Sequence, residues 1–229
     1  MHISGAIALV TGANRGLGRQ FATQLLERGA TKVYATARRP ELVTVPGVEI
    51  LPLDITDPAS VAAAAEAAAD VNLLVNNAGV AFGTDLVVGD LDVLHREMDT
   101  NFWGTLSVVR AFAPQLAGGA ILNVLSVLSW IAFQGSGGYA ASKSAQWSLT
   151  NGVRLELAGQ KTQVTGLHLG AADTDMTAGY DVPKTDPAVI VKAGLDGLEA
   201  GYWEVLADEW SRGAKAALAA DPRAYYNQQ

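Results

Sequence analysis

The sequence predicts a doubly wound α/β fold: one domain, residues 1–229, with a parallel sheet of about seven strands flanked by helices. Short apolar runs alternate along the chain with longer segments of helical character. The runs are continuously apolar, which is typical of strands that are covered on both faces and joined in parallel by helical crossovers. No linker or repeat divides the 229 residues, and one large sheet can occupy this length.

Each element follows from a local pattern. Helices are expected at residues 19–28, 61–69, 90–116 and 139–158. The second of these follows Asp57-Pro58, a favourable cap and first helical residue, and the third is expected to break near Gly104. Residues 179–187 are expected to form a loop. The expected strands are the apolar runs at residues 6–10, 32–36, 48–53, 71–75, 120–124, 163–169 and 203–206.

The composition disfavours several classes of protein. A net charge of -7 argues against nucleic acid and anionic membranes as partners, because both attract basic surfaces. The chain has no cysteine and only three scattered histidines, so neither a disulfide framework nor a metal site is expected. The first residues lack the features of a secretion signal, and no apolar run is long enough to span a bilayer. We therefore expect a cytoplasmic protein.

A glycine-rich turn follows the first predicted strand and opens the first helix. Residues 11–18 read T-G-A-N-R-G-L-G. Gly12 permits a tight turn, Gly16 lets the backbone approach a diphosphate, and Gly18 lets the helix pack closely on the strand. The N-terminus of the helix would then present free N–H groups to the anion. This turn is typical of a dinucleotide-binding Rossmann fold, although an ordinary glycine-rich turn has the same composition.

The residues after the second strand bear on the choice of cofactor. A chain that binds NAD usually has an acidic residue there, which accepts a hydrogen bond from the ribose 2′-hydroxyl. Here the strand ends in Arg38-Arg39, and a guanidinium suits a 2′-phosphate instead. Arg15, in the glycine turn, is placed to reach the same phosphate. The sequence therefore favours NADP(H), unless these arginines are only solvated surface charges.

Tyr139 and Lys143 lie four residues apart, so a helix places them on one face. A phenol is a weak acid with a pKa of about 10, and a neighbouring ammonium favours its phenolate. Such a pair can exchange a proton with a substrate near neutral pH. Ser126, thirteen residues before Tyr139, offers a hydroxyl that polarises a carbonyl oxygen, with Ser129 as a rival. Taken alone, Tyr139 could equally be a helix residue that packs on the core, and Ser126 a turn residue at the end of a strand.

Together these motifs resemble the short-chain dehydrogenase/reductase family, in its short single-domain branch. The resemblance rests on residues 11–18, 76–79 (N-N-A-G), Asn101, Ser126 and 139–143, in order and in register over nearly the whole chain. It implies an NADP(H)-dependent oxidoreductase that reversibly reduces a ketone or aldehyde to an alcohol. It also implies a homodimer or homotetramer, formed through helices at residues 102–116 and 139–158.

The resemblance further assigns roles to individual residues. Tyr139 would be the acid/base, Ser126 would hydrogen-bond the substrate oxygen, and Asn101 would hold a water of the proton relay. Lys143 would bind the nicotinamide ribose and lower the pKa of the phenol. The residues expected to contact the cofactor are Gly12, Asn14, Arg15, Gly16, Leu17, Gly18, Arg38, Asp54, Ile55, Asn77, Ala78, Gly79, Tyr139, Lys143, Gly170 and Thr174.

The sequence departs from the family after the sixth strand. Leu169 stands where the family usually has proline before Gly170, so a less rigid turn is expected. Ala171 and Ala172 are small, and we expect space beside the nicotinamide for bulky aryl or cyclic ketones. Candidate pocket walls are Trp130, Phe133, Trp147 and Tyr180, with packing preferred for Trp147.

Other functions share some of these residues. An imine or a sugar is an alternative substrate for the same chemistry. Nucleotide-sugar epimerases and dehydratases share Y-x-x-x-K, but they carry a larger C-terminal substrate domain than 229 residues allow. A non-catalytic NADP-sensing module is the remaining alternative, and the joint presence of Asn101, Ser126, Tyr139 and Lys143 argues against it.

Overall fold

The computed structural model describes residues 1–226, and within them seven strands form one sheet in the order β3-β2-β1-β4-β5-β6-β7. Every pairing between neighbouring strands is parallel, which confirms the predicted sheet. The strands are β1 (Ile7–Thr11), β2 (Lys32–Ala37), β3 (Glu49–Pro52), β4 (Leu73–Asn76), β5 (Ala120–Val124), β6 (Gln163–His168) and β7 (Glu204–Leu206).

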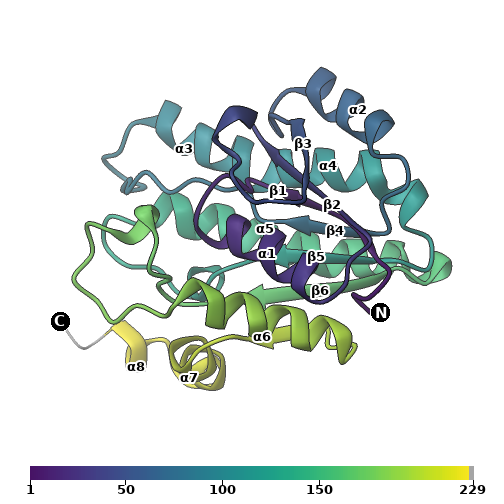
Figure 1. The fold of residues 1–229 in the computed structure, drawn as a ribbon. Helices are drawn as coiled ribbons and strands as arrows, with labels where there is room; N and C mark the ends of the chain where they lie inside the picture. The colour runs from purple at the N-terminus through teal and green to yellow at the C-terminus, as the bar shows by residue number, and fades with distance from the viewer. Residues whose placement is uncertain (227–229) are drawn as a thin grey trace.

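Helices cover both faces of this sheet (Figure 1). Side chains alternate along the strands between two hydrophobic clusters, so that Val10 packs in one cluster and Leu9 in the other. The first cluster includes residues of α1 and α6, and the second includes residues of α2, α4 and α5. The helices are α1 (Gly16–Glu27), α2 (Pro58–Ala67), α3 (Leu91–Met98), α4 (Thr105–Phe112), α5 (Gly137–Glu156), α6 (Pro187–Glu199), α7 (Glu209–Ala217) and α8 (Arg223–Tyr226).

The predicted helices form, with differences at their ends. The carboxylate of Asp57 accepts a hydrogen bond from the Ala59 amide at 2.9 Å, which is the expected cap of α2. Helix α1 begins at Gly16, three residues before the predicted start. The predicted break near Gly104 is instead a π-helical turn (Asp99–Gly104) that joins α3 to α4 without interrupting the helical path. Helices α6, α7 and α8 were not anticipated from the sequence.

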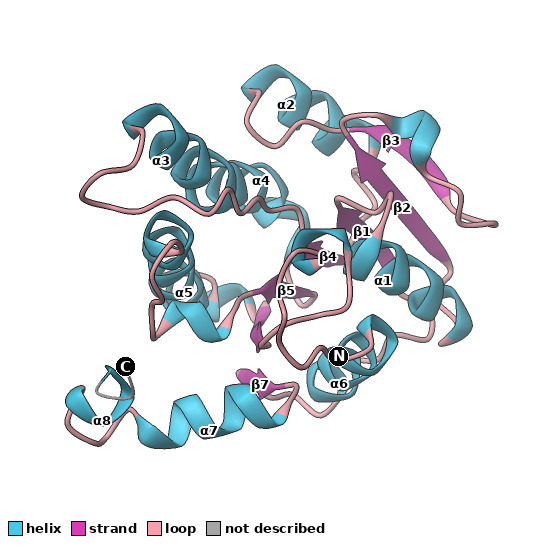
Figure 2. Cartoon of the chain, turned by 90° about the vertical axis from the view of Figure 1, so that its left-hand side faces the viewer, coloured by secondary structure: helices cyan, strands magenta, loops and turns pink. Residues whose placement is uncertain are grey.

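The strand order places the binding edge. From β1 the chain builds outward through β2 and β3, and it then returns to β4 on the other side of β1. The connections after β1 and β4 therefore diverge at the carboxyl edge, where open α/β sheets bind their ligands. The loops after β4 and β6 extend from this edge on the left of Figure 1, and Figure 2 looks onto it. Every motif of the sequence analysis lies on a connection that leaves this edge or begins just beyond it.

Candidate functional site

The glycine turn has the geometry that its sequence predicts. Gly12 and Gly16 have φ angles of +68° and +52°, in the left-handed region that favours glycine. A Cβ atom on Gly18 would lie 2.1 Å from the Gly12 carbonyl oxygen, so only glycine fits where α1 crosses the turn. Asn14 is half-buried within the turn, and Leu17 packs against the first hydrophobic cluster.

The β4 end holds this turn in place. Asn77 donates from its side-chain amide to the carbonyl oxygens of Thr11 (2.9 Å) and Gly12 (3.2 Å). The Thr11 hydroxyl in turn accepts from the backbone amides of Asn77 and Ala78, both at 2.9 Å. Asn77 and Ala78, predicted as cofactor contacts, thus also fix the shape of the turn.

The turn presents an uncapped helix end. Arg15 occupies the N-cap position of α1, and no side chain among residues 1–226 caps this helix. The first N–H groups of α1 therefore face the turn without an internal partner, as an anion site requires. The Arg15 guanidinium pairs with Asp175 at 3.0 Å, and both side chains are exposed. Thr174 also closes on the turn, since a Cβ on Gly16 would lie 3.2 Å from its Cγ2.

Two arginines stand exposed where β2 ends. Arg38 and Arg39 follow Ala37, the last residue of β2. Burial acts to raise the pKa of nearby Asp54, but hydrogen bonds from Thr56 and the charge of Arg38 outweigh it, so the pKa is lowered. Asp54 is therefore an anion beside Arg38. The Ile55 side chain is buried in the second cluster, which leaves only its backbone for the predicted cofactor contact.

Ser126, Tyr139, Lys143 and Asn101 converge beyond β4 and β5. The Ser126 hydroxyl lies near enough to the Tyr139 hydroxyl to lower its pKa, whereas the Ser129 hydroxyl accepts from the Ser126 amide at 3.4 Å, which favours Ser126 over its rival. The Lys143 Nζ lies 5.8 Å from the centre of the Tyr139 ring. A Cβ on Gly79 would lie 3.0 Å from Asn101 Oδ1 and 3.7 Å from Lys143 Nζ, so the N-N-A-G segment borders this group.

Lys143 and Asn101 belong to one buried polar network. The Lys143 ammonium donates to the Val124 carbonyl oxygen (3.0 Å) and to Gln146 Oε1 (2.7 Å), and Gln146 donates to the Thr105 hydroxyl (3.0 Å). Thr105 donates to the backbone oxygen of Asn101 at 2.9 Å, across the π-helical turn.

Asn101 itself ties three segments together. Its side-chain amide donates at 2.9 Å both to the Val80 carbonyl oxygen and to the Ser142 hydroxyl, and its Oδ1 accepts from the Val80 amide at 2.9 Å. Gln146, Thr105 and Ser142 were absent from the sequence prediction. Gln146 lies three residues after Lys143, and this spacing was the available signal.

The proton affinities differ from the expectation. Burial raises the pKa of Tyr139 to about 12, although the hydrogen bond with Ser126 acts in the opposite direction. Burial also lowers the pKa of Lys143 to about 7. The predicted lowering of the phenol pKa by Lys143 is thus not seen, because the Lys143 side chain is buried and donates to Val124 and Gln146 instead, and Tyr139 is itself partly buried. The Tyr139 phenol is therefore protonated at neutral pH.

A buried carboxyl group that the sequence analysis missed lies beside Tyr139. Glu97, on α3, is fully buried, and its Oε1 accepts from the Phe82 amide at 2.7 Å. Its Oε2 has no hydrogen-bond partner among the described residues. A Cβ on Gly138 would lie 2.2 Å from this oxygen, so α3 packs directly on the first turn of α5. Burial raises the pKa of Glu97, against the opposing hydrogen bond from Phe82.

A second charged cluster underlies Ser126. The ring of His168, a buried residue, lies with Nδ1 at 3.1 Å from the Ser126 carbonyl oxygen and Nε2 at 3.4 Å from Glu204. The hydrogen bond with His168 is the main cause that lowers the pKa of Glu204 to about 2, and Lys215 adds to it. Trp130 stacks on His168 at 3.9 Å. Trp130 was predicted as a pocket wall, but it packs in this cluster instead.

The turn after β6 is held by contacts with the start of α7. The Gly170 amide donates to the Asp208 carboxylate at 2.7 Å, and a Cβ on Gly170 would lie 2.6 Å from the Trp210 ring. Asp208 is the N-cap of α7, so the start of this helix fixes the turn that lacks the family's proline. These contacts offset the missing proline, and the expected lower rigidity of the turn stays a prediction.

These residues fit a dinucleotide. The glycine cradle leaves no room for a Cβ at Gly18, α1 offers free N–H groups, and Arg38 and Arg39 supply charge for a phosphate at the end of β2. Gly79 and Lys143 border the far end of the same edge, next to Tyr139. One ligand that spans the β1–β4 divergence would meet all of these groups.

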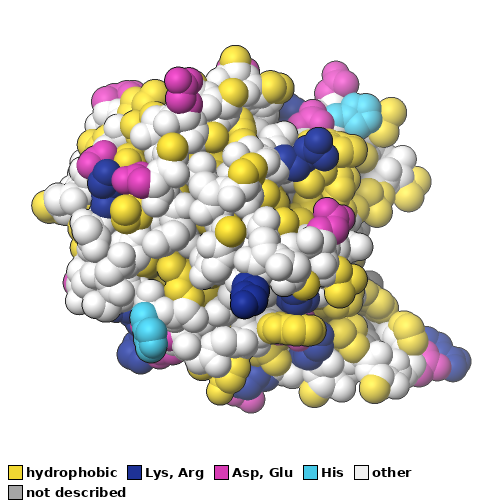
Figure 3. Space-filling view, turned by 90° about the vertical axis from the view of Figure 1, so that its right-hand side faces the viewer, with side chains coloured by type: hydrophobic (Ala, Val, Ile, Leu, Met, Phe, Trp, Pro, Cys, Tyr) yellow, Lys and Arg dark blue, Asp and Glu magenta, His cyan; other side chains and the backbone are white. Residues whose placement is uncertain are grey.

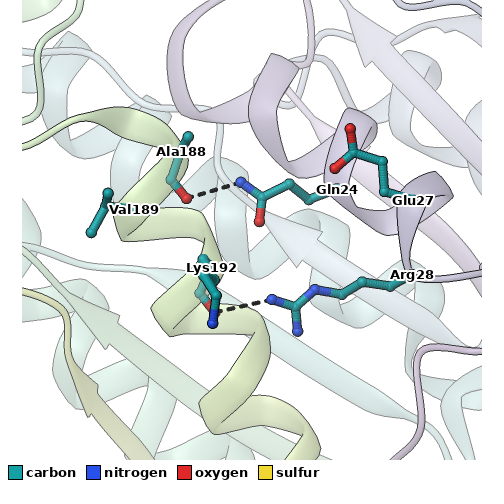
Figure 4. A pocket seen from close by; sticks show the side chains of 6 residues that line it. All are labelled: Gln24, Glu27, Arg28, Ala188, Val189 and Lys192. Carbon is teal, nitrogen blue, oxygen red and sulfur yellow. Dashed lines mark hydrogen bonds between the residues drawn. The ribbon is translucent and has the colours of Figure 1, made fainter.

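Another pocket, of about 380 Å³, lies between α1 and α6 (Figure 4). Gln24 donates to the Ala188 carbonyl oxygen at 2.9 Å, and Arg28 donates to that of Lys192 at 3.3 Å. These bonds hold α1 against α6, and we interpret the pocket as a groove between packed helices. The face shown in Figure 3 has charged side chains of both signs scattered among hydrophobic ones. None of the helices within residues 1–226 combines the length and apolar character needed to cross a membrane.

The fold and site define a dinucleotide-binding oxidoreductase, and comparison with known proteins identifies the family. The family model for short chain dehydrogenases matches residues 6–184. The chain belongs to the short-chain dehydrogenase/reductase family.

Individual relatives agree with this assignment. A crystal structure of a short chain dehydrogenase from Burkholderia cenocepacia J2315, in complex with NADP, is 40% identical, with a TM-score of 0.95 over 100% of this chain and 98% of that one. The 1-deoxy-11-beta-hydroxypentalenate dehydrogenase of Streptomyces avermitilis is 32% identical over 80% of this chain and 75% of its own length. A 3-ketoacyl-(acyl-carrier-protein) reductase from Brucella melitensis, complexed with NADH, is 25% identical, with a TM-score of 0.81 over 88% of this chain and 96% of that one.

The Glu97 carboxyl predicts a pH-dependent stability. Because its pKa is raised in the folded state, ionisation destabilises the fold as the pH rises above the ordinary glutamate value of about 4.3. We expect Glu97→Gln to gain stability relative to the wild type as the pH increases from about 4 to 8. Urea unfolding at several pH values measures this change, with exposed Glu66→Gln as the control. A difference between Glu97→Gln and wild type that is constant with pH would contradict the assignment.

Proposed function

We propose that this oxidoreductase uses NADP(H) to reduce a ketone or aldehyde to an alcohol, with Tyr139 as the proton donor. One observation carries the proposal: the hydroxyls of Ser126 and Tyr139 meet beside buried Lys143, at the edge where the glycine turn opens. A bound NADPH would supply the hydride.

The protein's own residues would supply the proton and the orientation. A carbonyl oxygen that gains negative charge needs a hydrogen-bond donor and a proton. Ser126 is placed to give the hydrogen bond, and Tyr139, with a pKa of about 12, is protonated at neutral pH and able to give the proton. This protonation state favours the reductive direction near neutral pH. Alcohol oxidation would need the phenolate and would become faster as the pH rises.

Lys143 would orient the cofactor and Asn101 would orient Lys143. Lys143 already donates to Val124 and Gln146, and in its protonated form it has a third N–H for a ribose hydroxyl beside Gly79. Asn101 fixes the N-N-A-G segment through Val80 and fixes α5 through Ser142. A water held between Asn101 and Lys143, as the family resemblance suggests, would connect Tyr139 to solvent.

The preference for NADP(H) rests on Arg38 and Arg39. Both are exposed at the end of β2, where a 2′-phosphate would lie, and the relative from Burkholderia cenocepacia has NADP bound. Asp54 partly offsets the charge of Arg38. Arg15, the third predicted contact of this phosphate, is paired with Asp175 in an exposed ion pair and would have to leave that pair to bind it.

Replacement of Tyr139 by phenylalanine tests the proton donor. We expect Tyr139→Phe to lower the rate of NADPH-dependent carbonyl reduction by about 10²- to 10⁴-fold, the usual contribution of a general acid. The dissociation constant for NADPH, measured by fluorescence titration, should stay within about twofold, because the phenyl ring still fills the site. Tyr202→Phe, at an exposed tyrosine, is the control. Turnover near the wild-type rate in Tyr139→Phe would reject the assigned role.

Replacement of Arg38 by aspartate tests the cofactor preference. Loss of a charge-assisted hydrogen bond to the 2′-phosphate should weaken NADPH binding by about 10- to 100-fold. NADH has no 2′-phosphate, so its affinity should be unchanged or improved. Arg110→Asp on the exposed surface of α4 makes the same change in net charge and serves as the control. Unchanged discrimination between the two cofactors in calorimetric titrations would show that Arg38 does not read the 2′-phosphate.

A further inference from the structure

We propose that Trp210 and Phe133 form an aromatic wall of the substrate site that selects carbonyl compounds bearing a planar aromatic ring. The inference deepens the proposed function and rests on it. Both side chains are large and partly exposed, at 37% for Trp210 and 47% for Phe133. Their ring centres lie 5.9 Å apart with a 43° tilt, the spacing of interacting aromatic rings.

Trp210 is connected to the reacting hydroxyls by the turn after β6, which lies between them. The Val127 amide donates to the Leu169 carbonyl oxygen at 2.8 Å, so this turn lies beside Ser126. Gly170 follows directly, and the Trp210 ring packs on it so closely that a Cβ there would lie 2.6 Å from the ring. Phe133 belongs to the segment that connects Ser126 to Tyr139. The two rings therefore come from segments that adjoin the two reacting hydroxyls.

Both rings are held on fixed backbone. Asp208 binds the Gly170 amide at 2.7 Å and thereby anchors the start of α7, which carries Trp210. The Phe133 loop is closed on itself by Ser136, whose hydroxyl accepts from the Phe133 amide (2.9 Å) and donates to its carbonyl oxygen (2.8 Å).

Two distant segments brace the same loop. The Gly135 amide donates to Asp85 at 2.8 Å, and the Ala132 amide donates to the Tyr226 hydroxyl in α8 at 3.2 Å. Figure 2 shows how α7 runs beyond β7 toward α8, below α5. A rigid wall favours a rigid, flat ligand, because little conformational entropy is lost on binding.

Tyr180, in the segment after β6, is a third exposed aromatic residue near the reacting hydroxyls. Tyr180 is 54% exposed, and its hydroxyl is 4.0 Å from a Cβ position on Gly83, in the loop after β4. Tyr180 is also near enough to Tyr139 to raise its pKa. The aromatic residues that surround the reacting hydroxyls therefore come from the segments after β5 and β6 and from α7.

Three hydroxyl groups near this wall already take part in hydrogen bonds within the protein, which disfavours a sugar at these positions. The hydroxyl proton of Ser136 goes to Phe133, and the Thr177 hydroxyl donates to the Ala172 carbonyl oxygen. The Ser129 hydroxyl accepts from the Ser126 amide. A sugar needs several free hydrogen-bond partners, and a site that leaves its hydroxyls unpaired disfavours it. An aryl group needs only the exposed ring surfaces.

Equilibrium binding of three ketones tests the wall. Acetophenone, cyclohexyl methyl ketone and acetone are titrated calorimetrically into the enzyme saturated with NADP⁺, which has no hydride to give, so that binding is measured without reaction. The wild type should bind acetophenone more tightly than cyclohexyl methyl ketone. Trp210→Ala should raise the dissociation constant for acetophenone by about tenfold and change that for acetone by less than twofold.

Further variants keep the test decisive. Trp203→Ala, at a 65% exposed tryptophan just before β7, is the matched control and should leave all three constants unchanged. Phe133→Leu, on the loop, should also weaken acetophenone binding, and it replaces Trp210→Ala if that variant does not fold. Equal binding of the aromatic and cyclohexyl ketones by the wild type, or no loss of acetophenone affinity in either variant, would overturn the proposal.

Measurement of turnover distinguishes failure of the aromatic-wall proposal from failure of the proposed function. If the wild type binds acetophenone as expected but NADPH reduces none of the carbonyl compounds, the proposed function fails and the wall stands. If reduction of acetone or acetophenone proceeds and neither variant alters acetophenone binding, the wall fails and the proposed function stands.

Discussion

The site depends on an ammonium group that the fold buries. Lys143 is 4% exposed and has no carboxylate partner among the described residues, so its solvation comes from the Val124 carbonyl oxygen and Gln146. Removing a charge from water in this way is costly unless every polar neighbour is in place. The end of β5, the π-helical turn and helix α5 must therefore meet in one arrangement. That arrangement also sets Tyr139 against Ser126.

The carboxyl edge of the sheet carries two groups of residues on different strands, one suited to bind a dinucleotide and one suited to react with a substrate. The turn after β1 and the end of β4 make an anion cradle, whereas the segment after β5 carries the two hydroxyls and, with α7, the proposed aromatic wall. Asn77 and Asn101 link the halves, because one fixes the glycine turn and the other fixes the segment after β4. A ligand bound across the gap between the β1 and β4 connections would therefore have one end in the glycine turn and the other end next to Tyr139.

Local sequence patterns predicted most of the fold and the residues expected to contact the cofactor and the substrate. Gly18 and the Tyr139–Lys143 spacing follow from short-range rules, and the structure agrees with both. Helix α6 was missed although Asp186-Pro187 repeats the signal that marked α2 at Asp57-Pro58. Glu97 was not predictable, since its role comes from α3 crossing α5 at Gly138. The pKa values of Tyr139 and Lys143 depend on burial, which spacing alone does not reveal.

A spectroscopic titration of Tyr139 tests the central claim most directly. The near-ultraviolet absorbance of phenolate is followed from about pH 7 to 11 in the wild type and in Tyr139→Phe, and the difference isolates one tyrosine. With the pKa raised to about 12, we expect no phenolate from Tyr139 below about pH 10, where an ordinary tyrosine is half ionised. A difference signal that titrates near neutral pH would show that Tyr139 is not held as a protonated donor and would contradict the account.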